Sequence, residues 1–194
     1  MSEGKAILWR RLDLPGHDAA TIESIGEGWR VSGVALVVES ALPCRVEYDV
    51  ACDLRWVTRD CSLRGYVGAR PVALDIVRSA SGNWTVNGVD APGLQECTDI
   101  DLGFTPATNL LPIRRLKLEV GHRAIVRAAW IRFPEFTAEG LDQVYTRQAG
   151  DRYLYESDNG AFRRELRVDS FGCVVEYPGL WRAEASAPLS AIEC

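Results

Sequence analysis

Apolar and polar residues alternate along much of this chain, as they do in β-strands that bury one face. The clearest run extends from Cys44 to Thr58, where even-numbered positions are mostly apolar and odd-numbered positions are mostly polar or charged. No glycine or proline interrupts the run, so it predicts a single strand about 50 Å long at roughly 3.3 Å per residue. A strand of that length in a small protein must bend or pass between layers. We therefore expect a strongly curled antiparallel sheet.

Shorter strand-like segments recur at intervals of about 8 to 12 residues, separated by glycine, proline, asparagine and aspartate. Residues 34–38 are continuously apolar, which predicts burial on both faces. Residues 18–27 have few strand formers and predict a loop, and the Ala- and Ser-rich residues 183–194 predict a loosely held tail. Strands are predicted at residues 5–12, 29–39, 63–67, 71–78, 83–86, 115–120, 125–133, 141–147, 152–156, 162–168 and 173–177. With almost no helical periodicity, the fold class is all-β.

Residues 96–102 place two carboxylates on one strand face. Asp99 and Asp101 alternate with Ile100 and Leu102, so the acids share one face and the apolar pair shares the other. Three interpretations stay open for the acids: a structural network, hydrogen bonds to ligand hydroxyls, and acid–base catalysis of the glycosidase type. The network interpretation predicts that Asp99 or Asp101 pairs with a nearby arginine.

The chain then changes its pattern and offers those arginines. Thr105-Pro106 is typical of a helix start. Pro112 removes a backbone donor, so we expect any helix between the two prolines to be about one turn long. Arg114 and Arg115 follow, before the alternation resumes. The acids, Asn109 and the two arginines are thus expected to meet at one corner between two strands.

Three motifs carry a resemblance to a known family. The run CTDIDLGFTPATNLLPIRRL (residues 97–116) resembles the signature of a bacterial family of putative glycolipid-binding proteins, a domain of unknown function. The motifs YPGLW (177–181) and DLRW (53–56) are similar to others of that family. The resemblance covers most of the chain and implies one domain over residues 1–194, built as a single strongly curled antiparallel sheet. Such a sheet is a spiral β-roll or half-open barrel with few short helices.

Composition and charge argue against some classes of partner and location. The formal net charge of −5 provides no general basic field, so nucleic acid is not an expected partner. The first residues contain no secretory h-region, and no run approaches the roughly 20 apolar residues of a membrane helix, so stable membrane insertion is not expected. We expect a cytoplasmic protein, whose partner is an amphipathic small molecule or a glycolipid.

The six cysteines fit no metal-binding pattern. No two form a CxxC pair, and in a reducing compartment they are expected to be buried thiols. The two histidines, His17 and His122, lie in predicted turns and are expected at the surface. No nucleophile elbow, glycine-rich phosphate loop or activated cysteine motif is present, so neither a cofactor nor a metal is expected.

Aromatic residues provide the candidate binding surface. Six tryptophans are many for a chain of 194 residues, and a Trp ring can contact both a sugar face and an acyl chain. On the concave apolar face we expect Tyr48 and Trp56, with Trp84, Trp130 and Tyr155 as weaker candidates. The polar candidates are Asp99, Asp101, Asn109, Arg114 and Arg115.

These residues predict non-enzymatic binding of a glycolipid or lipid-linked sugar on the concave face. The glycolipid component of this prediction comes from the resemblance. The first alternative is an enzyme of glycolipid or sugar metabolism that uses Asp99 or Asp101 as acid or base. The second is a protein-interaction module with an exposed sheet edge, whose concave face is filled by its own side chains.

Overall fold

The computed structural model describes residues 4–189 and contains one 15-stranded sheet. The first arm of the sheet consists of β1 (Gly4–Arg11), β2 (Gly16–Ser24), β3 (Gly28–Glu39), β4 (Leu42–Asp53), β5 (Thr58–Val67), β6 (Arg70–Arg78), β7 (Trp84–Val86) and β8 (Val89–Asp90). The second arm consists of β9 (Asp99–Leu102), β10 (Arg123–Ile131), β11 (Ala138–Ala149), β12 (Arg152–Ser157), β13 (Phe162–Val168), β14 (Val174–Tyr177) and β15 (Trp181–Pro188). The helical segments are α1 (Leu110–Leu116) and the short 3₁₀ turns η1 (Pro92–Leu94), η2 (Ala107–Asn109) and η3 (Asp158–Gly160).

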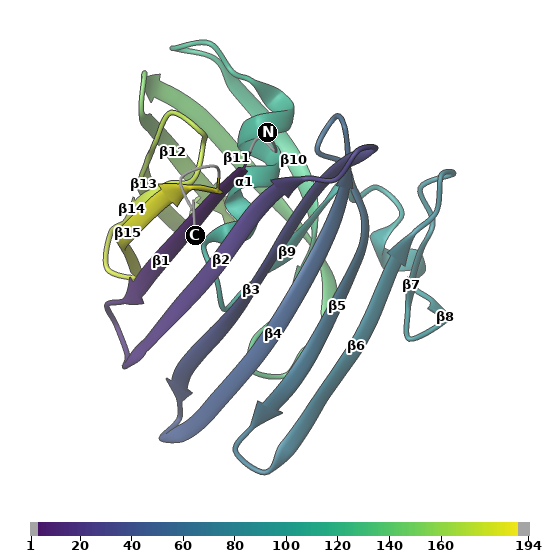
Figure 1. Cartoon of the computed structure of the whole chain (residues 1–194). Coiled ribbons are helices and arrows are strands. Elements are labelled where there is room, and N and C mark those ends of the chain that lie inside the picture. Colours follow the sequence, from purple (N-terminus) through teal and green to yellow (C-terminus); the bar gives the residue numbers. More distant parts are fainter. Residues whose placement is uncertain (1–3, 190–194) are drawn as a thin grey trace.

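Strands that follow one another in the chain pair side by side in each arm, and the pairing of β1 with β15 joins the arms. All pairs are antiparallel except β9 with β10, which is parallel because α1 lies in the connection between them. The sheet does not close into a barrel, and its two edges are β8 and β9. Figure 1 shows β1 to β6 in front, with α1 and β9 to β11 behind them. The predicted all-β, curled, mainly antiparallel sheet is confirmed.

The sheet curls into a spiral because the β9 edge lies against the start of β5. The backbone N–H of Thr58 donates to the carbonyl oxygen of Thr98 at 3.2 Å, and the Thr58 hydroxyl accepts the N–H of Ile100 at 3.0 Å. These bonds satisfy backbone groups at the edge strand, which would otherwise be unpaired and prone to aggregation. The main core lies between this inner edge and the first arm.

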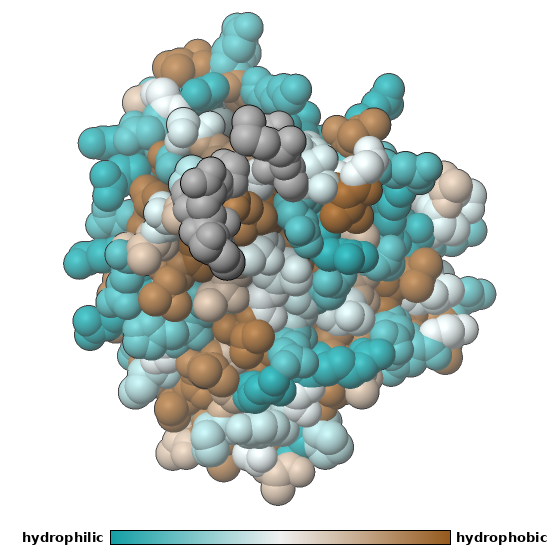
Figure 2. Space-filling view, viewed as in Figure 1, coloured by the Kyte–Doolittle hydropathy of each residue, from teal (hydrophilic) through white to brown (hydrophobic). Residues whose placement is uncertain are grey.

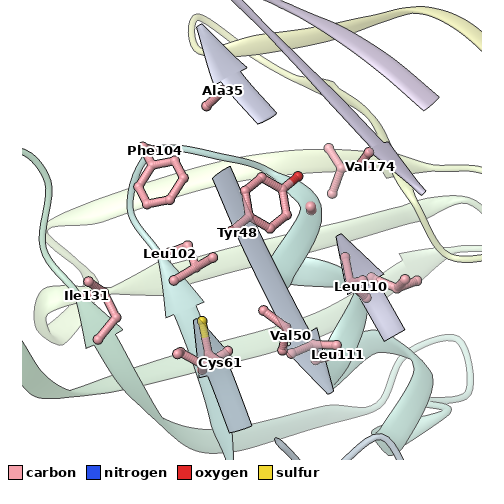
Figure 3. Close-up of a cluster of buried hydrophobic side chains, with 14 of the residues drawn as sticks. Ala35, Tyr48, Val50, Cys61, Leu102, Phe104, Leu110, Leu111, Ile131 and Val174 are labelled. Atoms are coloured by element: carbon pink, nitrogen blue, oxygen red, sulfur yellow. The ribbon is translucent and has the colours of Figure 1, made fainter. Parts of the chain in front are cut away.

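Figure 3 shows part of that core. Leu102 and Ile131 of the inner strands lie near Val50 and Cys61 of the first arm, and Leu111 of α1 packs beside them. All five side chains are buried. Full burial of one aliphatic side chain of this kind contributes about 1.5–3 kcal/mol, so α1 and β9 are held in place chiefly by apolar packing.

The prediction of one strand over residues 44–58 was wrong. β4 ends at Asp53, whose carboxylate accepts the backbone N–H groups of Arg55 at 2.8 Å and Val57 at 2.9 Å. Trp56 then adopts a left-handed conformation with φ +66°. Asp is a good turn former because its side chain replaces a backbone acceptor. The alternation therefore continues through a turn that no glycine or proline marks.

The predictions for residues 105–120 were also wrong in part. α1 continues to Leu116, because Pro112 lies at its third position, where a helix needs no backbone donor. The predicted strand at 115–120 does not form. Lys117 ends the helix in a left-handed conformation with φ +46°, and its N–H donates to the carbonyl of Ile113. Arg115 is thereby placed on the helix.

Three further expectations were wrong. Residues 18–27 were expected as a loop, but β2 extends to Ser24 and pairs with both β1 and β3. Residues 34–38 alternate, since Ala35 and Val37 are buried and Leu36 is 54% exposed. The predicted loose tail instead forms β15 as far as Pro188, and the remainder of that prediction lies outside the described residues. Hydrogen bonding to β1 holds β15 in an extended conformation, although its own Ala-rich sequence has weak strand propensity.

Five of the six cysteines are buried free thiols, as predicted, and Cys194 lies outside the described residues. His17 and His122 are exposed, also as predicted. Across residues 4–189, no group of three or more His, Cys, Asp or Glu side chains is arranged to hold a metal ion. No helix in the same part of the chain is long and apolar enough to cross a membrane.

Candidate functional site

A cavity of about 550 Å³ opens on the concave face of the second arm. Its lining combines aromatic rings, aliphatic side chains and a few hydrogen-bonding groups. The lining residues are Asp101, Leu102, Gly103, Thr105, Asn109, Trp130, Arg132, Leu141, Tyr155, Ser157, Asp158, Phe162, Tyr177, Leu180 and Trp181. Four of the predicted binding residues are among them: Asp101, Asn109, Trp130 and Tyr155.

Strand register explains why these four residues meet. Asp101 of β9 lies opposite Trp130 of β10, and partners opposite one another share a face of the sheet. On the next strands, Tyr145 of β11 lies opposite Tyr155 of β12. Their ring centroids are 5.1 Å apart. The cavity is thus lined from one continuous face across β9 to β12.

Asp101 is one of the two carboxylates that line the cavity. Gln143 donates to its Oδ2 at 2.6 Å, and the Thr108 hydroxyl lies 3.4 Å from its Oδ1. Removal from water raises the pKa of Asp101 to about 6, although these hydrogen bonds lower it. A carboxylate has about four acceptor positions, so Asp101 retains acceptor capacity for a hydroxyl group in the cavity.

The segment that leads into α1 closes one side of the cavity. The Asn109 side-chain amide donates to the Tyr145 hydroxyl at 3.0 Å, which anchors η2 on the concave face. Thr105 is held from the other direction, since its hydroxyl donates to Asp18 and accepts the N–H of Ala107 at 3.0 Å. These bonds pass through the interior of the roll and connect the first arm to the cavity wall.

Aromatic rings form another part of the lining. The ring centroids of Tyr155 and Tyr177 are 6.3 Å apart, and that of Phe162 lies 6.0 Å from Tyr155. Trp181 begins β15 beside Tyr177, its partner in the β14–β15 pair. Such rings present both a large apolar surface and, in Tyr and Trp, a polar edge. The cavity can therefore hold a ligand that has an apolar and a hydroxylated part.

Asp99 lies outside the cavity lining and forms the predicted ion pair. Arg115 donates through Nε to Oδ1 at 3.0 Å and through Nη2 to Oδ2 at 2.5 Å. The Asp99 side chain is 1% exposed. Burial raises the pKa of Asp99, and the Arg115 guanidinium opposes that shift. The prediction that one of the acids pairs with one of the arginines is confirmed.

The other predicted binding residues lie outside this cavity. The Arg114 guanidinium carbon lies 5.1 Å from the ring centroid of Trp56. Trp84 is buried and donates through Nε1 to the carbonyl of Cys97 at 3.1 Å. The Tyr48 hydroxyl donates to Asp18 at 2.9 Å. We base the binding hypothesis on the four predicted residues that line the cavity.

Some cavity residues were not selected from the sequence. Tyr177, Leu180 and Trp181 all belong to the YPGLW motif, so that motif was the available signal. Gln143, which donates to Asp101 but does not line the cavity, was missed because a lone Gln in an alternating strand has no distinguishing pattern.

A second hollow lies on the outer face of the sheet. It has a volume of about 760 Å³ and crosses β15, β1, β2, β3 and β4, where most of the side chains are small. Figure 2 shows pale, weakly polar residues in the middle of this face. Gly33 lies in the groove, and an added Cβ there would collide with the Tyr48 hydroxyl. Gly33 therefore leaves room for the buried Tyr48 hydroxyl.

The sequence and structure of this chain resemble those of known proteins. The sequence model of the family described as putative glycolipid-binding matches residues 6–183. A DUF1089 family protein from Pseudomonas aeruginosa is 31% identical, with a TM-score of 0.77 over 85% of this chain and 90% of that chain. A β-barrel-like protein of the DUF1849 domain of unknown function from Brucella abortus is 10% identical, with a TM-score of 0.58 over 97% and 98% of the two chains, and shows the fold alone. Among curated proteins, none matches the sequence.

Proposed function

Since this chain belongs to the putative glycolipid-binding family, we propose that it binds a glycolipid or lipid-linked sugar, without catalysis, in the cavity of the second arm. One observation carries the proposal: the cavity lining combines the hydrogen-bonding side chains of Asp101 and Asn109 with a cluster of aromatic rings. The volume of about 550 Å³ lies in the ordinary range for small-molecule sites.

The polar end of the cavity would recognise the sugar. Asp101 accepts hydrogen bonds from hydroxyl groups, and within the described residues the side-chain oxygen of Asn109 has no donor. Trp130 extends from the strand next to Asp101, where its ring can lie against a sugar face. Leu141 and Leu180 continue the wall with purely apolar surface for an acyl chain.

A titration with n-octyl β-D-glucoside below its micelle concentration tests this function. Methyl β-D-glucoside supplies the sugar alone and n-octanol the chain alone. The proposal predicts that the complete amphiphile binds more tightly than either part, because both ends of the cavity contribute. Equal binding of octanol and octyl glucoside would reject sugar recognition. Native mass spectrometry and lipid extraction of the purified protein would identify the natural ligand.

Trp130→Ala should weaken octyl glucoside binding at least about tenfold, because a lost aromatic contact in a pocket costs more than about 1.4 kcal/mol. Tyr66→Ala is the matched control, since Tyr66 is a 42% exposed aromatic on β5 outside the cavity. Trp130 is only partly buried, so the variant should fold. Affinity is measured from the intrinsic fluorescence of the remaining tryptophans. Equal losses in both variants would contradict the assigned cavity.

A second candidate function is an enzyme of glycolipid or sugar metabolism. The observation in its favour is Asp101, whose carboxyl lines the cavity with a pKa raised to about 6 by burial, near the range of a general acid. Asp99 is buried and paired with Arg115, so a second carboxylate would have to be Asp158. The test is hydrolysis of 4-nitrophenyl glycosides. Loss of that activity in Asp101→Asn, with the free energy of unfolding unchanged, would favour an enzyme.

A further inference from the structure

We propose that a separate cavity, beside the C-terminal end of α1, binds a small oxyanion such as a phosphate group. It has a volume of about 300 Å³ and lies between α1 and the loops around Gly150 and Ser170. It shares no lining residue with the cavity of the second arm. This inference is therefore independent of the proposed glycolipid binding, and either can fail alone.

The charge balance of this cavity favours an anion. Arg114, Lys117 and Arg147 line it, and none of the three forms a salt bridge with any described carboxylate. The carboxylate of Asp169, the one acidic lining residue, already has other partners. It pairs with Lys5 and accepts backbone N–H groups from three successive residues, at 2.9, 2.9 and 3.0 Å. Three cations thus face the cavity without a free counterion in the described chain.

Arg114 is held there by neutral groups. Its guanidinium carbon lies 4.9 Å from the ring centroid of Phe171, and Nη1 is 3.3 Å from the Phe171 carbonyl oxygen. Its Nε is buried and has no hydrogen-bond partner among residues 4–189. A buried donor without a partner costs roughly 1–3 kcal/mol, more when it is charged. An oxyanion beside Arg114 would offset that cost.

Arg147 is fixed on the other side. It donates to the carbonyl oxygens of Leu118 and Gly150, each at 2.7 Å, and its guanidinium carbon lies 5.7 Å from the Tyr153 ring centroid. These partners orient the charge but do not neutralise it. Lys117 is exposed at the helix end, where its flexible side chain can close on a bound anion.

Cations at a helix C-terminus have a simpler explanation, since they interact favourably with the helix dipole. That accounts for Arg114 and Lys117, which belong to the end of α1. It does not account for Arg147, which extends from β11. The net charge of −5 also repels anions in general, so phosphate binding would require this local cluster.

Calorimetric titration with inorganic phosphate at constant ionic strength tests the site. The proposal predicts saturable binding of one phosphate, with roughly fivefold weaker affinity in Lys117→Gln, the loss expected for one exposed charge. Arg163→Gln, on an arginine that is 63% exposed on β13, should bind as the wild type does. No saturable binding, or equal weakening in both variants, would overturn the proposal.

One further titrant separates the two possible sources of the phosphate group. Tighter binding of dihexanoyl phosphatidic acid than of inorganic phosphate assigns the site to a lipid headgroup. Equal or weaker binding assigns it to free phosphate. Both outcomes support an oxyanion site only if Lys117→Gln weakens the titrant concerned. A titrant that binds equally to wild type and Lys117→Gln counts against the site.

Discussion

Arg115→Met is expected to lower the free energy of unfolding by about 3–5 kcal/mol, the usual loss when one partner of a buried ion pair is removed. The reason is Asp99, whose side chain is 1% exposed and would remain without its counterion. Met preserves most of the apolar stem of Arg115, so the change isolates the charge and its two hydrogen bonds. Urea unfolding near neutral pH measures the loss.

Two variants make this result specific. Arg163→Met removes an arginine that is 63% exposed and pairs with Glu156 at 3.8 Å, so it should cost less than about 0.5 kcal/mol. The double variant Arg115→Met with Asp99→Asn should recover part of the stability, since no unpaired charge is left in the core. A loss below about 1 kcal/mol in Arg115→Met would show that Asp99 is neutral or reaches water in the folded state.

Asp18→Asn is expected to change how stability depends on pH. Asp18 is fully buried, and burial raises its pKa from the ordinary 3.8 to about 6, although hydrogen bonds from Thr105 and Tyr48 lower it. The fold therefore prefers the protonated acid. The stabilisation that Asp18 gives is present below the unfolded pKa and is lost as pH rises through about 6.

The difference in unfolding free energy between wild type and Asp18→Asn should therefore change by about 2.5 kcal/mol between about pH 4 and about pH 7.5, with the wild type losing stability relative to the variant at the higher pH. Asn is nearly isosteric but does not ionise. Urea unfolding of both proteins at several pH values measures this difference. The contributions of the other carboxylates mostly cancel, because both proteins contain them. Asp142→Asn, at an exposed aspartate on β11, should run parallel to wild type. Parallel curves for Asp18→Asn would contradict the assignment.

Local sequence was sufficient where strong strand formers alternate with polar residues. The alternation along residues 44–52 predicts β4 and its inward side chains correctly, because a period of two follows from strand geometry alone. The Asp99–Arg115 pair was also predictable, because both residues belong to one short motif and an acid and an arginine at a buried corner favour pairing. The order of neighbouring strands in each arm follows from short turns such as that at Asn87-Gly88.

The tertiary structure decided what depends on contacts between distant segments. β2 and β15 form because β1 pairs with both of them, although their own residues are weak strand formers. The cavity brings Asp101, Trp130 and Tyr155 together from separate strands, while Trp56, which the sequence ranked above Trp130 and Tyr155, is buried. The sequence by itself therefore determined the alternating strands and the motif that carries the acids and arginines. Only the curl of the sheet decided which aromatic residues line the cavity and which fill the core, because strand alternation specifies a face and not what covers it.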